Sequence, residues 1–184
     1  YKNKNMLVIH IISTSDTNDF SRIYEGLDAT ILINPNRAEC RRAIMNETGQ
    51  IVFIGHGTEC GLLNHMLNGY VVDSSMVQFL RGRDIIGIWC NASNFADRYG
   101  LTGFFTSMFI SNSNELIDCG FPLFDNCDDE INRQNQIFAS RINNLLVPQA
   151  PTRDWARILY SSLINEERFV YYNYEAMYST ENNN

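Results

Sequence analysis

The chain has 184 residues, of which 45% are hydrophobic and 12% aromatic, a composition typical of one packed globular domain. We therefore expect a single domain over residues 1–184. The formal net charge of −7 gives no electrostatic footprint for nucleic acid, which needs clustered Lys and Arg, and the one dense basic spot, 37–42, lies within a helical pattern. Apolar runs fall short of the roughly 18 residues that a membrane span needs, and the first residues turn polar too early for a signal peptide.

The five cysteines are odd in number and irregularly spaced, which favours free thiols over a disulfide framework. Cys60 and His65 are too isolated to form a zinc site, so we expect no metal and no cofactor. The chain begins with Tyr rather than Met, which suggests a piece of a longer protein. A compartment cannot be assigned, and the free thiols with no visible signal peptide only slightly favour the cytoplasm.

In chain order, apolar segments alternate with polar or helical ones. The segments that predict buried strands are 6–12, 29–33, 51–54 and 84–90. A short helix is expected at 18–27. The helix after 29–33 should have Asn34 as its N-cap, Pro35 in its first turn and Gly49 at its end.

Later segments follow the same alternation more weakly. We expect a hairpin at 61–72, short helices at 73–82 and 94–100, and a fifth strand at 103–110. Apolar residues on one face predict helices over 128–146 and 152–163. The aromatic run 168–178 predicts a last strand, and 179–184 a frayed tail. Strands that alternate with helices predict a mainly parallel sheet with helices on both faces, a three-layer α/β sandwich.

A histidine and a cysteine follow two successive predicted strands. His56 stands two residues after the strand 51–54, and Cys90 stands at the end of the strand 84–90. Ligands of an open parallel sheet bind beyond the carboxyl ends of its strands, and neighbouring strands lie roughly 4.8 Å apart. We therefore expect the two side chains to meet across a cleft.

Such a pair has a known chemistry. A helix after Cys90 would favour a thiolate through its N-terminal dipole. His56 would act as base and then as proton donor to the leaving group. The backbone N–H groups of Gly57 and Cys90 would bind a developing oxyanion, with the glycines around His56 leaving room for a substrate.

The stretch "IVFIGHGTECG", followed by "DIIGIWCNASNFADRYGLTGFFTSMFI", resembles the caspase-like cysteine peptidases of clan CD: caspases, gingipains, clostripain-like enzymes, separases and CHAT domains. The resemblance covers about residues 5–112, and 113–178 would complete the same domain. It implies a caspase-like fold and a cysteine endopeptidase with a His56 and Cys90 dyad and a thioester intermediate. It implies a protein or peptide substrate and leaves room for an activating partner domain.

Two residues depart from the pattern of this family. Trp89 stands where a small residue is usual, so its side chain must pack on the opposite face of the strand. Ile88 stands where an acidic or amide residue often lines the S1 pocket, which puts specificity for a charged P1 residue in doubt.

By the same resemblance, residues 13–16 and 111–114 form the other walls of the S1 pocket, with Ser111 and Asn112 as substrate-binding candidates. Asp16 is the only carboxylate among them and would favour a basic P1 residue. Asp16 is equally an N-cap candidate for the helix near residue 18, the interpretation we favour.

Other interpretations remain open. A catalytically silent caspase-like scaffold or regulatory module is compatible with Trp89 and Ile88. A different α/β protein, for example a flavodoxin-like binder of small ligands, is a third interpretation, but the sequence contains no Gly-rich phosphate loop that would support it. His10, within an apolar strand, is expected to be a core histidine bonded to a neighbour, and His65 a solvated turn residue.

Overall fold

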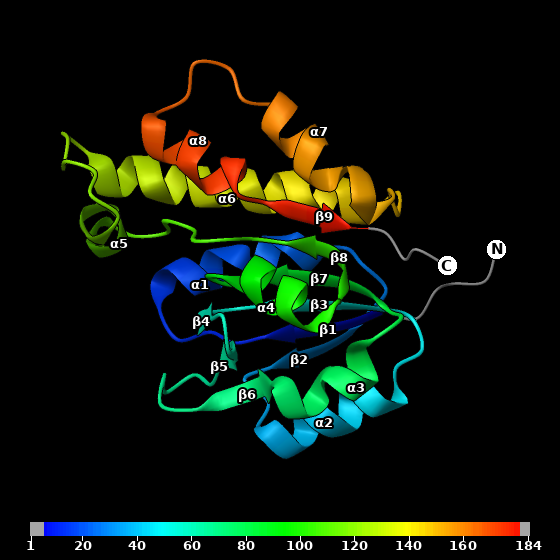
Figure 1. Ribbon diagram of the computed structural model, residues 1–184. Helices are drawn as coiled ribbons and strands as arrows, with labels where there is room; N and C mark the ends of the chain where they lie inside the picture. The colour runs from blue at the N-terminus through cyan, green and yellow to red at the C-terminus, as the bar shows by residue number, and fades with distance from the viewer. Residues whose placement is uncertain (1–5, 181–184) are drawn as a thin grey trace.

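The computed structural model describes residues 6–180, which form three layers around a central six-stranded sheet (Figure 1). The sheet has the strand order β2-β1-β3-β7-β8-β9, in which only β9 is antiparallel to its neighbour. Its strands are β1 (Met6–His10), β2 (Thr30–Ile33), β3 (Gln50–Ile54), β7 (Asp84–Ile88), β8 (Thr102–Phe105) and β9 (Tyr178–Thr180). The predicted class, a three-layer α/β sandwich with a mainly parallel sheet, is confirmed.

Helices cover both faces of this sheet (Figure 1). One layer contains α1 (Ser15–Asp19), the 3-10 helix η1 (Phe20–Tyr24), α6 (Cys127–Leu146), α7 (Trp155–Ser161) and α8 (Arg168–Glu175). The other contains α2 (Arg37–Asn46), the 3-10 helix η2 (Ser74–Met76), α3 (Val77–Leu80) and α4 (Ala92–Tyr99). The remaining helices are α5 (Ser113–Asp118), beside the carboxyl ends of the strands, and the 3-10 helix η3 (Thr152–Asp154).

Alternation along the strands divides the core into two clusters. Val8, Val52 and Ile86 face α6, whereas Leu7, Ile51 and Ile85 face the layer of α2 and α4. A small antiparallel sheet of β4 (Gly57–Thr58), β5 (Gly61–Leu63) and β6 (Tyr70–Asp73) belongs to the second layer. The β5–β6 pair confirms the hairpin predicted at 61–72.

The second strand and the helix after it differ from expectation. β2 is an edge strand, so Ile31 and Ile33 are exposed at 39% and 47% rather than buried. Asn36, not Asn34, caps α2, because its side chain accepts a hydrogen bond from the N–H of Glu39. Asn34 has a left-handed backbone instead, and its amide oxygen accepts the N–H of Ile12 at 2.7 Å.

The prediction of a last strand at 168–178 was wrong over most of its length. Residues 168–175 form α8, whose buried residues Phe169, Val170, Asn173 and Tyr174 share one helical face. Strand β9 comes only afterwards, and it includes the first two residues of the expected tail, whereas 181–184 lie outside the described residues. β8 ends at Phe105, well before the expected 110, and 106–112 cross the carboxyl ends of the strands without regular structure.

Within residues 6–180, no helix is long and apolar enough to cross a membrane. All five cysteines are free thiols. His10 is fully buried, and its ring nitrogens contact the Tyr24 hydroxyl at 3.0 Å and the Thr17 carbonyl at 2.7 Å, which confirms its place in the core. His65 lies exposed in the turn between β5 and β6, also as predicted.

Candidate active site

The expected neighbours β3 and β7 are adjacent and parallel. Ile54 pairs with Ile88 at the end of the ladder, and the N–H of Gly55 donates to the Ile88 carbonyl at 3.1 Å. His56 and Cys90 each follow two residues after this last pair, so they emerge at the same edge of the sheet. Both line one pocket, which we call the Cys90 pocket.

The Cys90 pocket is small. It holds about 20 Å³ of free space, roughly the room of one water molecule. Its other lining residues come from α1, η1, the ends of β3 and β7, and the segment after β8: Thr17, Phe20, Gly55, Ile88, Trp89, Thr106, Phe109 and Ser111.

The Cys90 thiol is neutral in this arrangement. Burial, followed by the negative charge of Glu115, raises its pKa to about 12, and Sγ donates to the Phe109 carbonyl at 3.7 Å. The expected help from α4 is absent, because the N–H groups of Asn91, Ala92 and Ser93 are bonded to backbone carbonyls. The prediction of a helix-stabilised thiolate was therefore wrong.

His56 is held through one ring nitrogen. Nε2 lies 2.9 Å from the Thr14 hydroxyl and 3.7 Å from a carboxylate oxygen of Asp16. Nδ1 has no hydrogen-bond partner within residues 6–180. An imidazole anchored through Nε2 has Nδ1 available to exchange a proton with another group.

Asp16 bonds to residues at this edge of the sheet and does not cap the N-terminus of α1. Thr14 is the N-cap of α1, so the N-cap interpretation of Asp16 was wrong. The carboxylate instead accepts from Ser111 Oγ at 2.6 Å and from Asn112 Nδ2 at 3.2 Å. Burial alone would raise its pKa, but hydrogen bonds and the nearby His56 outweigh burial and hold the pKa below its ordinary value.

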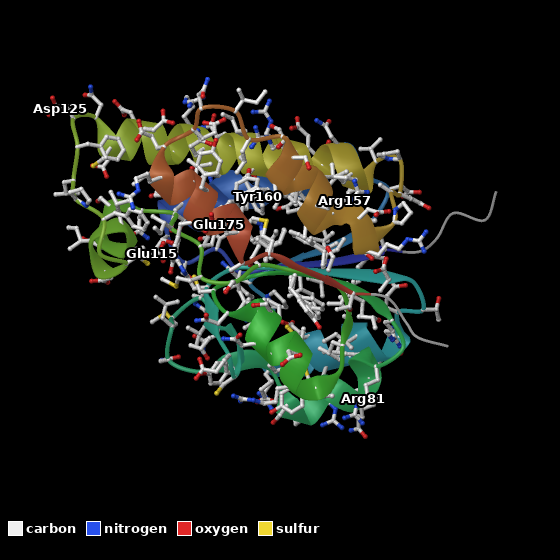
Figure 2. All side chains as sticks on the ribbon, turned by 45° about the horizontal axis from the view of Figure 1, so that its top comes forward. Arg81, Glu115, Asp125, Arg157, Tyr160 and Glu175 are labelled. Atoms are coloured by element: carbon white, nitrogen blue, oxygen red, sulfur yellow. The ribbon has the colours of Figure 1, made fainter. Side chains whose placement is uncertain are left out.

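A second carboxyl group lies behind Ser111. Glu115 is on α5, at the same end of the molecule (Figure 2), and its Oε2 accepts the Ser111 N–H at 2.7 Å. The same oxygen lies 2.9 Å from Ser111 Oγ, whose single proton cannot serve both Glu115 and Asp16. Burial raises the pKa of Glu115, whereas hydrogen bonds hold the pKa of Asp16 below its ordinary value, so Asp16 is the more readily ionised of the two.

The remaining predicted site residues lie as follows. Ile88 and Ser111 line the Cys90 pocket. Asp16 and Asn112 stand behind this lining, and Asn112 also caps α5 by accepting the N–H of Glu115. Within residues 6–180, the N–H of Cys90 has no acceptor.

Gly57 is required for a reason that the sequence did not suggest. A Cβ at this position would lie 2.1 Å from the Trp89 ring and 2.6 Å from the Gly61 carbonyl. Trp89 does pack on the face opposite to Cys90, where it contacts Phe53 and Phe95. The N–H of Leu63, in β5, donates to the carbonyl of His56, just before β4. In an antiparallel ladder the next pair, Gly57 with Leu62, is then non-hydrogen-bonded, so the Gly57 N–H points away from β5.

Sequence reasoning missed Phe109 and Glu115, and it placed Thr14 in the pocket wall 13–16 without its contact to His56. The pattern Asn112-x-x-Glu115 is a helix-capping signal that could have located α5, and with it this second carboxyl group. Neither Thr14 nor Phe109 carries a comparable local signal.

Comparisons with protein-family models, curated proteins and solved structures gave no match.

Proposed function

We propose that this chain is a cysteine endopeptidase in which Cys90 is the nucleophile and His56 the general base. One observation carries the proposal: both residues follow the last pair of the β3–β7 ladder by two positions and line one pocket. The resemblance of residues 5–112 to caspase-like peptidases points to the same pair.

In the proposed reaction, His56 takes the proton of the Cys90 thiol as Sγ attacks the carbonyl carbon of the scissile peptide bond. The bond between carbon and nitrogen then breaks, and the imidazolium returns the proton to the departing amine. Water hydrolyses the thioester and regenerates the thiol. Because the pKa of Cys90 is raised, His56 has to remove the thiol proton in each turnover.

The surrounding groups have supporting roles in this proposal. The N–H groups of Gly57 and Cys90 stabilise the oxyanion, since one is turned away from its sheet and the other has no acceptor within residues 6–180. Asp16 and Thr14 are positioning residues, because they contact Nε2 of His56. Asp16 favours the imidazolium that forms during the reaction.

A catalytically silent scaffold is the second candidate, and two observations favour it. The pKa of Cys90 is raised to about 12, and the pocket beside the thiol admits little more than a water molecule. A module of this kind would use its surfaces rather than its thiol.

Alkylation with a peptidyl chloromethyl ketone, which binds as a substrate does, followed by peptide mass spectrometry, tests the choice. The peptidase proposal expects Cys90 to react faster than the exposed Cys60, and expects His56→Ala to remove this advantage. Release of a fluorophore from peptide substrates should disappear in Cys90→Ala. Slow, uniform labelling of the exposed thiols without hydrolysis would favour the scaffold.

A further inference from the structure

The size of the Cys90 pocket limits what a substrate could place beside the thiol. About 20 Å³ accommodates one group of the size of water or methyl. The floor is apolar because it is formed by Phe20, Ile88 and Phe109. These side chains are only 5%, 3% and 6% exposed to solvent. A charged side chain would lose its hydration there without gaining a partner.

The three hydroxyl groups that line the pocket already donate their protons to other residues. Thr17 Oγ1 donates to the Thr14 carbonyl at 2.8 Å, and Thr106 Oγ1 donates to the Trp89 carbonyl at 2.9 Å. Ser111 Oγ is used by Asp16, whose carboxylate does not line the pocket. None of these three hydroxyls has a proton left to donate to a polar side chain.

The closed shape is built into the packing of residues 106–112, which we call the covering segment. The side chain of Asn173 on α8 bonds both the N–H and the carbonyl of Ile110, at 2.7 and 3.0 Å. Asn135 on α6 donates to the Ser111 carbonyl at 2.9 Å. The covering segment is therefore fixed by two helices of the same layer.

Aromatic contacts fix the floor as well. The ring of Phe109 packs edge-on against Phe20, with centroids 5.8 Å apart, and at a tilt against Phe138 of α6, with centroids 4.7 Å apart. Phe20 in turn contacts Phe138 at 5.9 Å. Each ring of the three touches the other two, so none can move away without opening a void in the core.

We propose that the Cys90 pocket receives the P1 side chain of the substrate and selects peptides with glycine or alanine at that position. The proposal rests on the peptidase function above and names its substrate class. Phe109 and Ile88 are the specificity-determining residues: Ile88 forms the floor on the same side of β7 as Cys90, and Phe109 closes the pocket beside Ile88.

The test compares kcat/KM for fluorogenic peptides that differ only at P1, with Gly, Ala, Leu, Arg and Asp. Wild-type protein should cleave after Ala at least about 100-fold more efficiently than after Leu, since a few extra methylenes that do not fit are worth such a factor. Ile88→Val and Phe109→Leu are mild substitutions that enlarge the pocket while keeping the core apolar. Each substitution should reduce the ratio of kcat/KM for the Ala peptide to kcat/KM for the Leu peptide by about tenfold.

Phe79→Leu is the matched control, because Phe79 is a partly buried phenylalanine packed against the opposite cluster. It should leave the Ala to Leu ratio unchanged. Preferred cleavage after Arg, Asp or Leu by the wild-type protein would overturn the size selection and leave the peptidase function standing. No cleavage after any P1 residue, together with no labelling of Cys90 by an alanyl chloromethyl ketone peptide, would overturn both.

Discussion

Nε2 of His56 lies 3.7 Å from the carboxylate of Asp16, although 56 − 16 = 40 residues separate the two in the chain. The contact joins the end of β1 to the end of β3, which are neighbours in the sheet. It gives the proposed base a negative partner that is itself buried and hydrogen-bonded.

Asp16→Asn should therefore lower kcat between about tenfold and 100-fold, because the neutral amide no longer favours an imidazolium and a charge-assisted contact is worth about 1.5–3 kcal/mol. Steady-state hydrolysis of an alanyl fluorogenic peptide measures the effect. Asp19→Asn, at the end of the same short helix, is the control and should keep its activity. Equal losses in both variants would indicate damage to α1 rather than to His56.

Cys90→Ala and His56→Ala should each reduce hydrolysis to background, and the double variant should lose no more than either single one, since the two act as a unit. The free energy of unfolding of Cys90→Ala should change by no more than about 1 kcal/mol. Cys60→Ala, which removes an exposed thiol, controls for the substitution itself. Activity in Cys90→Ala close to wild type would exclude this nucleophile.

The stability of the fold should fall as the pH drops below neutrality because of His10. Burial lowers the pKa of His10 from 6.5 to about 4, so the folded protein keeps it neutral while the unfolded chain takes up a proton. The contribution of neutral His10 to the free energy of unfolding is fully present above pH 6.5 and is lost as the pH falls from there through about 4. Between pH 7 and 5 the expected loss is about 2 kcal/mol, slightly offset by Glu115, whose raised pKa acts in the opposite sense.

Urea unfolding at pH 7 and pH 5 measures this loss. His10→Gln, which keeps a hydrogen-bond donor but cannot be protonated, should flatten the dependence at some cost in stability at pH 7. The same slope in wild type and His10→Gln would assign the acid sensitivity to other groups.

Gly57→Ala should destabilise the protein by about 1–3 kcal/mol through overpacking, because the new methyl group would overlap the Trp89 ring. Thermal unfolding of the single variants and of Gly57→Ala combined with Trp89→Ala gives the coupling between the two sites. Rescue in the double variant should be partial, since the Gly61 carbonyl still crowds the methyl group. Additive losses would show that Trp89 is not what Gly57 accommodates.

The sheet, and the placement of His56 and Cys90 at one edge of it, could be predicted because both follow from local signals. Continuous apolar runs marked β1, β3 and β7, and parallel neighbours bring their carboxyl ends to one edge. The aromatic residues of α8 misled the prediction, since Phe169, Val170 and Tyr174 suit a strand by propensity. The segment forms a helix because these residues are spaced along one helical face and pack against α6.

The environment of the thiol could not be predicted for a different reason. Phe109 and Asp16 reach Cys90 and His56 through contacts between residues far apart in the chain, and no spacing encodes them. The dipole argument for Cys90 failed because it assumed free amides at the start of α4. Ser107, Trp89 and Thr106 supply the carbonyls that occupy these amides, and only the path of the chain after β8 brings two of them there.

The two hydrogen bonds between Asn173 and Ile110 can form only after both residues have been synthesised. The ribosome adds Asn173 later than Cys90 by 173 − 90 = 83 residues, which at about 5–20 residues per second is roughly 4–17 s. Strand β9, which completes the sheet, emerges later still. During this interval the covering segment lacks the two hydrogen bonds from Asn173 that hold Ile110 in the finished protein.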